Sequence, residues 1–339
     1  MLKTIWAVSE RGAVGMQSQA LGLGEALFAG GGFEAPKVFE VAFRWPYTWA
    51  PMTPAFASIR SLTPDTATPF EEAAKAGQWP DLLITCGRKS ALLALAVKKL
   101  SGGRTVCIHV QDPKADPRYW DLLIVPEHDR ARAPNVLVSK GALHRVTRTK
   151  LSTSAEALAP QLEHIPSPRL AVLVGGNNRY YTLDAEWMGG FVAQLRQATQ
   201  QGLATQQGQG ANWGILATIS RRTGEAETNI LRGGLASMPG TYLWDGSGPN
   251  PYFGFLGLAD AILVTCDSVS MISEACATGK PVYVVRLPGN SKRFDAFFEN
   301  LRRRGLIQWF DGHLAQWENT RLDDMDHIAD EVRERLGWR

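Results

Sequence analysis

Residues that could bind an anionic, hydroxyl-rich ligand gather in one stretch towards the C-terminus. Asp267, Ser268 and Ser270 follow the short apolar run 261–265, and Glu274 comes four residues later. Side-chain oxygens at such a place suit a helix N-cap and first turn, where backbone N–H groups lack acceptors within the helix. The same N–H groups attract phosphates and other anions. The alternative is an ordinary capped helix without a ligand, because capping alone accounts for Asp267 and Ser268.

The elements around these residues favour a ligand site. The run 261–265 is apolar up to Thr265, as in a strand covered on both faces, and apolar residues then recur at helical spacing from Met271 to Cys276. Gly279 and Pro281 end the helix before the next apolar run begins. The stretch therefore predicts a strand, a helix and a second strand, with the polar helix start at the carboxyl end of the first strand. Open α/β sheets bind ligands at that edge.

Polar residues follow other predicted strands of the second half in the same way. They are Gly175, Gly176 and Asn177 after one strand, Ser220, Arg221 and Arg222 after the next, and Asn250 and Tyr252 in a later loop. A glycine pair lets a ligand approach the backbone, and adjacent arginines offer bidentate donors to a diphosphate. The Tyr252 ring could pack on a nucleobase or only close the domain, and both arginine heads could simply be solvated.

The first half of the chain repeats the pattern of strand, polar turn and helix. Its first strand is followed by a glycine-bearing turn with Gly15 and, on the next helix, Gln19. A later strand ends in His128 and Asp129, and an imidazole that titrates near neutral pH is a common general base. Asp129 could orient that base or bind a sugar hydroxyl. The alternative is a loop in which Asp129 caps a helix and His128 is merely exposed.

Length and composition bound the class of protein. The chain has 339 residues, long for one core and sufficient for two α/β domains. The predicted domains are 1–150 and 168–315, with a linker over 151–167 and a C-terminal helix within 316–339 that packs back on the first domain. A formal net charge of +3 does not call for a nucleic-acid partner. The 4 cysteines lie in apolar runs without metal-ligand spacing, so we expect reduced thiols, no metal and a cytoplasmic location.

Several of these segments together resemble the mitochondrial-fission ELM family, whose bacterial members are regarded as glycosyltransferases. The matching segments are Asp267 to Ala275, Thr278-Gly-Lys-Pro-Val, Gly15 to Gly22, Pro126-Glu-His-Asp, Leu173-Val-Gly-Gly, Ser220-Arg-Arg-Thr and Asn250-Pro-Tyr. They follow the family's order over nearly the whole chain. Gln19 matches a glutamine of the family, whereas Glu10-Arg11-Gly12 stands where the family usually has Asp-Gly.

The resemblance implies an α/β fold of the GT-B glycosyltransferase type, with two Rossmann-like domains facing a cleft. The second domain would bind a nucleotide-diphosphate sugar, with Glu274 on the ribose and the glycines, serines and arginines above on the diphosphate. The first domain would bind the acceptor, a bacterial glycolipid or lipooligosaccharide, with His128 or Asp129 as base. No cofactor is implied beyond this co-substrate. Two alternatives stay open: a nucleotide-sugar epimerase, and a non-catalytic adaptor like the plant members that act in mitochondrial fission.

Two segments suggest contact with a membrane. The stretch 41–60 mixes aromatic residues, prolines and two arginines without a regular period, as at a membrane interface. Arg302, Arg303 and Arg304 end a predicted helix and would suit an anionic leaflet. The alternative is a proline-broken segment packed on its own domain. We expect at most a peripheral protein, because no stretch approaches the roughly 20 apolar residues of a spanning helix.

Overall fold

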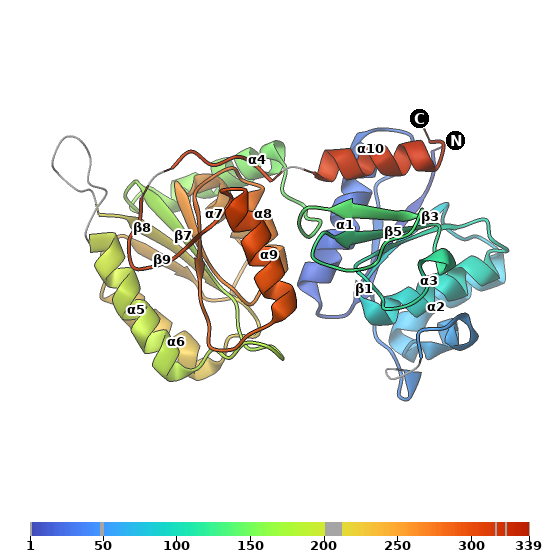
Figure 1. Cartoon of the computed structure of the whole chain (residues 1–339), viewed down its shortest axis with the longest axis horizontal. Helices are drawn as coiled ribbons and strands as arrows, with labels where there is room; N and C mark the ends of the chain where they lie inside the picture. The colour runs from blue at the N-terminus through green and yellow to red at the C-terminus, as the bar shows by residue number, and fades with distance from the viewer. Residues whose placement is uncertain (1, 48–50, 201–211, 316, 323, 339) are drawn as a thin grey trace. The chain divides into compact units, whose positions relative to one another are not determined.

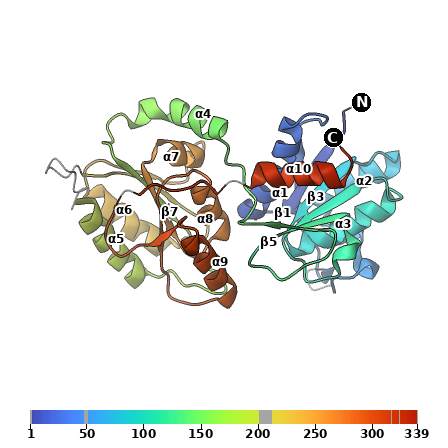
Figure 2. The same ribbon diagram turned by 45° about the horizontal axis from the view of Figure 1, so that its top comes forward.

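The structure, a computed structural model, describes residues 2–47, 51–200, 212–315, 317–322 and 324–338. The chain divides into two compact units (Figure 1). Unit 1 comprises Met1–Arg145 and Asp323–Arg339, and unit 2 comprises Val146–Leu322. Each unit is built on one parallel sheet with helices on both faces (Figure 2), and each is treated by itself below.

Unit 1 contains a six-stranded sheet in the order β2-β1-β3-β4-β5-β6, with all strands parallel. The strands are β1 (Ile5–Glu10), β2 (Lys37–Val41), β3 (Leu82–Cys86), β4 (Val106–Val110), β5 (Leu122–Pro126) and β6 (Val136–Ser139). The main helices are α1 (Val14–Ala29), α2 (Pro64–Ala76), α3 (Arg88–Leu100) and α10 (Met325–Arg335). The chain leaves β1 to one side for β2 and to the other for β3, so the topological switch point lies between β1 and β3.

Alternation along the strands assigns the helices of unit 1 to two faces. Ile5 and Ala7 of β1 pack in one apolar cluster with α1 and α10, whereas Val8 packs in a second cluster with α2 and α3. The C-terminal helix α10 lies beside α1 although the two are far apart in the sequence, as the red and blue helices of Figure 1 show. Its Ile328 and Val332 are buried in the α1 cluster.

Unit 2 contains a second parallel six-stranded sheet, in the order β12-β11-β10-β7-β8-β9. Its strands are β7 (Arg169–Val174), β8 (Gly214–Ile219), β9 (Thr241–Trp244), β10 (Ala261–Thr265), β11 (Val282–Val285) and β12 (Gln308–Trp309). Its helices are α4 (Arg148–Leu158), α5 (Ala185–Gln200), α6 (Glu225–Ala236), α7 (Tyr252–Leu258), α8 (Val269–Cys276) and α9 (Lys292–Arg303). Here the switch point lies between β7 and β10.

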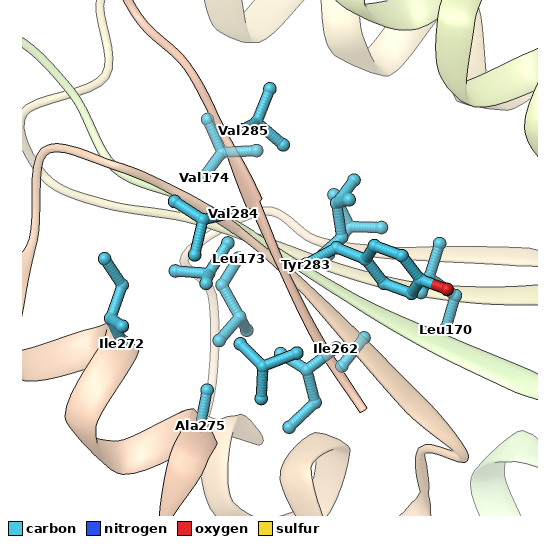
Figure 3. Packing of buried hydrophobic residues seen from close by; sticks show 14 of the residues in the cluster. Leu170, Leu173, Val174, Ile262, Ile272, Ala275, Tyr283, Val284 and Val285 are labelled. Atoms are coloured by element: carbon cyan, nitrogen blue, oxygen red, sulfur yellow. The ribbon is translucent and has the colours of Figure 1, made fainter. Parts of the chain in front are cut away.

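The core of unit 2 holds the central strands and α8 in fixed register. Ile272 and Ala275 of α8 point at the sheet, where Leu173 of β7 and Val284 of β11 lie (Figure 3). All four side chains are fully buried. Because α8 follows β10 directly, this packing fixes where the helix begins relative to the carboxyl edge of the sheet.

The segment 151–167, predicted as a linker, is instead helix α4 followed by the short 3₁₀ helix Ala159–Leu162, and it belongs to unit 2. Helix α4 has no fully buried side chain, which explains why its sequence lacks an apolar stripe. The backbones of α4 and α7 approach each other closely because two residues of α7 are glycines. A Cβ on Gly254 would lie 2.7 Å from Leu158, and one on Gly257 would lie 2.5 Å from the Leu151 carbonyl.

Candidate functional site

Asp267 joins three strand ends at the switch point of unit 2. Its side chain is fully buried and accepts hydrogen bonds from the Gly176 backbone N–H at 3.1 Å and the Thr265 hydroxyl at 2.6 Å. Its cationic partner is the Arg222 guanidinium, at 2.7 Å. Loops after β7, β8 and β10 therefore converge on one carboxylate. Asp267 supports the site from beneath, and its two oxygens are engaged within the protein.

Ser220, Arg222 and their neighbour Thr223 form a tight turn after β8. The Ser220 hydroxyl accepts from the Arg222 N–H at 3.0 Å, and the Thr223 hydroxyl donates to the Gly175 carbonyl at 2.5 Å. Arg222 also donates to the Gly176 carbonyl at 3.3 Å. The turn is thus fastened to the loop after β7, and the Arg222 head, 43% exposed, is held at the protein surface with one side still open.

Packing within the protein explains why the two residues after β7 are glycines, and the sequence alone could not reveal this. A Cβ on Gly175 would lie 2.1 Å from an Asp267 oxygen, and one on Gly176 would lie 2.3 Å from the Arg222 backbone. Both glycines are required by the close approach of neighbouring loops, so their presence alone is no evidence of a ligand. Asn177 is likewise occupied, because its side-chain oxygen accepts from the Leu183 N–H at 2.6 Å.

Helix α8 begins as predicted at the carboxyl end of β10. Ser268 is its N-cap and accepts from the Met271 N–H at 3.3 Å. The side chain of Ser270, in the first turn, is half-buried. With no acidic residue in the first turn, the positive end of the helix dipole is not neutralised from within the helix. The start of α8 is therefore suited to a negative group on a ligand.

Glu274 and Tyr252 form a hydrogen-bonded pair behind the start of α8. The Tyr252 hydroxyl donates to a Glu274 oxygen at 2.7 Å, and the Glu274 residue is only 7% exposed. Burial, the Glu274 charge and this hydrogen bond together raise the pKa of Tyr252 well above its usual value. The phenol therefore keeps its proton and orients the carboxylate. This contact engages only the hydroxyl of Tyr252, so the packing of its ring on a nucleobase stays a prediction.

Asn250 places Tyr252 at the start of α7. The Asn250 side-chain oxygen accepts from the Tyr252 N–H at 3.0 Å, while the residue itself is exposed. Because the loop after β9 ends here, the Asn250-Pro-Tyr segment brings a fourth strand end towards α8. Both residues stand out in the sequence, but neither the capping role nor the Tyr252–Glu274 pair could be read from their spacing.

Three exposed arginines lie at the same edge, of which the sequence pattern selected Arg221 and missed Arg179 and Arg286. Arg221 follows β8, Arg179 lies in the loop after β7, and Arg286 directly follows β11. Among the described residues none of the three is paired with a carboxylate. Arg286 stacks on Trp309 at 3.5 Å and Arg179 on Tyr180 at 4.4 Å, which fixes flat guanidinium groups without neutralising them. Arg286 stands directly after a strand, so the rule that selected Arg221 could have found it.

In unit 1, Gly15 and Gln19 belong to a small polar network at the switch point. The buried Gln19 amide donates to the Gly15 carbonyl at 3.1 Å and its oxygen accepts from Gln111 at 3.3 Å. Gln111 follows β4 and has a left-handed backbone, φ 78°, which is uncommon for a residue other than glycine. Gln111 directly follows β4, so the rule of a polar residue after a strand applies to it as well, although it was not among the predicted site residues.

His128 and Asp129 follow β5 at the same edge of the sheet, two strands beyond β3. His128 is half-buried, and Asp129 is 4% exposed. Arg132 donates to the Asp129 carbonyl at 2.7 Å and to the Glu127 carbonyl at 3.1 Å, so the loop is folded around that guanidinium. With β1 and β5 separated by β3 and β4, roughly 14 Å lies between this pair and the Gly15 turn. The two groups share an edge and do not form one cluster.

Cavities elsewhere in the described structure contain none of these residues. One of about 240 Å³ lies at the amino edge of the unit 1 sheet, beside Asp81 and Arg104. Another of about 320 Å³ lies at the amino edge of the unit 2 sheet, beside Asp260 and Pro281. Both open opposite the edges that carry the polar groups, and neither gathers the residues expected of an active site.

Comparison with known proteins decides the family. The family model described as mitochondrial fission ELM1 matches residues 14–336. The chain belongs to the mitochondrial fission ELM1 family. It is 30% identical over 290 residues to the mitochondrial fission protein ELM1 of Arabidopsis thaliana, and the match covers 76% of this chain and 65% of the plant protein. An uncharacterized protein of Rickettsia prowazekii is 25% identical over 277 residues, with 70% and 74% covered.

Solved structures similar to this ELM1 family member establish its fold. A UDP-N-acetylglucosamine 2-epimerase described as putative, from Listeria monocytogenes, superposes with a TM-score of 0.56 at 13% identity, covering 99% of this chain and 88% of that one. The UDP-GlcNAc 2-epimerase of Neisseria meningitidis, solved with UDP-GlcNAc bound, gives 0.52 at 12% identity, with 99% and 92% covered. The predicted GT-B-like α/β fold with two Rossmann-like units is confirmed.

Nothing in the described part of this ELM1 family member has the length and apolar character of a membrane-crossing helix. The basic end of α9 is also less available than its sequence suggests. Arg302 pairs with Glu299 at 3.1 Å, Arg303 lies 3.7 Å from the same carboxylate, and Arg304 donates to the Asn300 side chain at 2.7 Å. These arginines are partly balanced within their own helix.

Proposed function

We propose that this protein is a glycosyltransferase that moves a sugar from a nucleotide-diphosphate sugar to a glycolipid or lipooligosaccharide acceptor. The observation that carries the proposal is the charge at the carboxyl edge of unit 2. Four arginines lie on the loops after β7, β8 and β11, and only Arg222 is neutralised by a carboxylate among the described residues. Guanidinium groups bind diphosphates in a bidentate manner, and this edge is where open α/β sheets bind ligands.

The donor would bind with its diphosphate between the start of α8 and the arginines. Arg221 would contact the phosphate oxygens, and Arg222 is already positioned by Asp267. Glu274, oriented by the Tyr252 hydroxyl, would accept hydrogen bonds from the ribose. The UDP-GlcNAc complex of a protein with the same fold supports a nucleotide sugar as the donor class.

The reaction would break the bond between the anomeric carbon and the diphosphate oxygen. An acceptor hydroxyl oxygen would form the new bond, and its proton would pass to a base on unit 1, for which we propose His128 or Asp129. The leaving diphosphate gains negative charge as this bond breaks. Arginines and a helix N-terminus aimed at that charge stabilise it more in the transition state than in the bound substrate.

Two other functions have specific support. The two structural neighbours described above are epimerases, so an enzyme that alters the donor sugar without an acceptor is a candidate. The Arabidopsis relative is a mitochondrial fission protein, so an adaptor without catalysis is another. Arg221, Arg179 and Arg286 lie at one sheet edge and pair with no carboxylate among the described residues. An adaptor gives no reason for this, and we therefore rank it below the enzymes.

The test is incubation with a panel of nucleotide-diphosphate sugars, with and without bacterial glycolipid extract, and chromatography of the products. We expect a nucleoside diphosphate to be released only when extract is present, together with a heavier glycolipid. Free nucleotide with an altered sugar and no need for extract would instead identify an epimerase. A complete lack of turnover, together with no thermal stabilisation by any nucleoside diphosphate, would contradict the proposal.

A further inference from the structure

Two aromatic side chains of unit 1 are exposed to a degree unusual for their type. Trp45 has 81% of its surface exposed and Phe56 has 43%. Both lie between β2 and α2, in the lighter blue part of the chain beside α2 in Figure 1. Large apolar side chains that remain in solvent on one short segment are candidates for an interaction surface.

The segment is anchored to unit 1 by other residues. Phe43 forms an antiparallel bridge with Leu62, and the Arg44 N–H donates to the Ser61 carbonyl at 2.8 Å. This register places Trp45 across from Arg60. Phe56 is the last residue of the 3₁₀ helix η2 (Pro54–Phe56). A second 3₁₀ helix, η3 (Ile59–Ser61), follows, and both 3₁₀ helices lie against α3.

Half-buried residues of this segment hold it on the core, while the exposed rings face away. Met52, Ala57 and Ile59 pack against the apolar cluster formed with α2 and α3. The segment can therefore present Trp45 and Phe56 without unfolding, because these other apolar side chains already attach it to the core. Residues 48–50 lie outside the described residues.

The charge around these rings is of one sign. From residue 42 to residue 64 the sequence contains two arginines and no acidic residue. Arg44 and Arg60 are accessible to solvent, and among the described residues neither is paired with a carboxylate. The next acid, Asp65, is already paired with Arg11 at 2.6 Å. Apolar rings flanked by uncompensated arginines complement an anionic lipid surface, in which rings enter the headgroup region and guanidinium groups meet phosphates.

We propose that residues 44–46 and 51–60 form a surface that docks unit 1 on an anionic lipid bilayer. The surface continues from the carboxyl end of β2, and the Gly15 turn follows the adjacent strand β1 at the same edge. A lipid-linked molecule in that bilayer would be presented to the polar edge of unit 1. The inference concerns unit 1 only and does not depend on the proposed donor site of unit 2.

The experiment is co-flotation of the whole protein with vesicles of phosphatidylcholine alone and of phosphatidylcholine with 30% phosphatidylglycerol, a composition chosen to be anionic. We expect capture by the anionic vesicles only, decreasing as salt rises because surface charges are screened. Trp45→Ala should reduce the partition coefficient roughly tenfold. Arg60→Gln should reduce it roughly fivefold and flatten its salt dependence.

Matched controls separate this surface from general stickiness. Leu100→Ser removes a side chain that is 48% exposed at the C-terminal end of α3, and Arg302→Gln removes an exposed arginine of α9. Both should bind vesicles like the wild type. All variants should bind nucleoside diphosphate as the wild type does, so that failure here is distinct from failure of the donor site.

Several results would overturn the proposal. These are no capture, equal capture by neutral vesicles, or capture that Trp45→Ala and Arg60→Gln leave unchanged. Light scattering after size-exclusion chromatography could give a further contradicting result. A dimer that Trp45→Ala converts to monomer would assign the surface to a second copy of the chain.

Discussion

A fully buried carboxylate, Asp267, links the loops of the candidate donor site. Asp267 receives a backbone N–H, a hydroxyl and a guanidinium, and so each of its partners stabilises the charge that burial would otherwise disfavour. Removing Asp267 would release Arg222 and the loop after β7 together. We expect the ligand to contact the exposed arginines and the start of α8, which lie nearer the protein surface than Asp267.

The Tyr252 hydroxyl provides a test of that arrangement. We expect Tyr252→Phe to weaken nucleoside-diphosphate binding roughly tenfold, because Glu274 loses the donor that orients it. Stability should fall by about 1–3 kcal/mol, since a buried carboxylate is left with one hydrogen bond fewer. Tyr242→Phe is the control, because Tyr242 is a half-buried unit 2 tyrosine whose hydroxyl has no hydrogen-bond partner in the described structure. Titration calorimetry and thermal melts give both quantities. Lower stability with unchanged affinity would mean that the pair is only structural.

At this scale the sequence indicated where the candidate residues lie better than which partners they have. Asp267, Ser268 and Glu274 were selected by their place after a strand, and that place is correct. The partner of Asp267, Arg222, lies 45 residues away, and the partner of Glu274, Tyr252, lies 22 away. Local spacing carries no information on such pairs. The contact of Gln111 with Gln19, 92 residues away, is a further pair that local spacing does not reveal.

At the scale of elements, replacing either of two neighbouring glycines in α6 by alanine should change stability in opposite directions. Gly233 is exposed, and a Cβ added to it would have no other atom within 4 Å, whereas a Cβ on Gly234 would lie 2.3 Å from Val192 of α5. Gly233→Ala should therefore stabilise the protein by about 0.8–1 kcal/mol through helix propensity. Gly234→Ala should destabilise it by about 1–3 kcal/mol, because α5 and α6 must separate or Val192 must leave its rotamer. Thermal melts measure both, and a shift of the same sign in both variants would contradict this packing.

Most strands and helices follow from period and punctuation in the sequence, because most strands are largely apolar and end in a polar turn. The edge strands β2 and β12 carry polar residues and were not predicted. Helix α4 is the instructive exception. The side chains of α4 are at most partly buried, so its sequence lacks the apolar stripe that indicates a helix. The helix is held instead by close packing of its backbone on two glycines of α7. Contacts that depend on the absence of a side chain on a distant partner leave no periodic pattern, so the segment looked like a linker.

At the scale of the whole molecule, stability should fall in alkaline solution. Burial raises the pKa of Cys266 to about 11, that of Cys107 to about 12 and that of Tyr181 to about 12. The pKa values of Cys86, Cys276, Tyr252 and Tyr283 are raised as well, again by burial first. Unfolded thiols and phenols ionise near 9 and 10. The unfolded state therefore releases protons that the folded state keeps, and the free energy of unfolding decreases as pH rises through this window.

Lys280 acts in the opposite direction. Burial lowers its pKa to about 8, so between pH 8 and about 10.5 it makes the folded state gain stability as pH rises. Four thiols and three phenols outweigh one amine. Melting temperature should thus be nearly constant from pH 6 to 8 and decline from about 9 to 11, with no thiol reacting with a disulfide reagent at pH 8 before unfolding. A melting temperature that rises over pH 9–11 would contradict these burials.

The central claim, a nucleoside-diphosphate site at the carboxyl edge of unit 2, is tested most directly at Glu274. The measurement is calorimetric titration of wild type, Glu274→Gln and Glu274→Ala with the nucleoside diphosphate that stabilises the protein best, and Glu186→Ala serves as control because it removes an exposed acid of α5. Saturation of wild type at 100 times Kd should stabilise it by about 2.7 kcal/mol. Affinity should fall about tenfold for Gln and up to a hundredfold for Ala, because hydrogen bonds to a charged acceptor contribute roughly 1.5–3 kcal/mol. Affinities of both Glu274 variants within twofold of wild type, in protein that still melts cooperatively, would contradict the account.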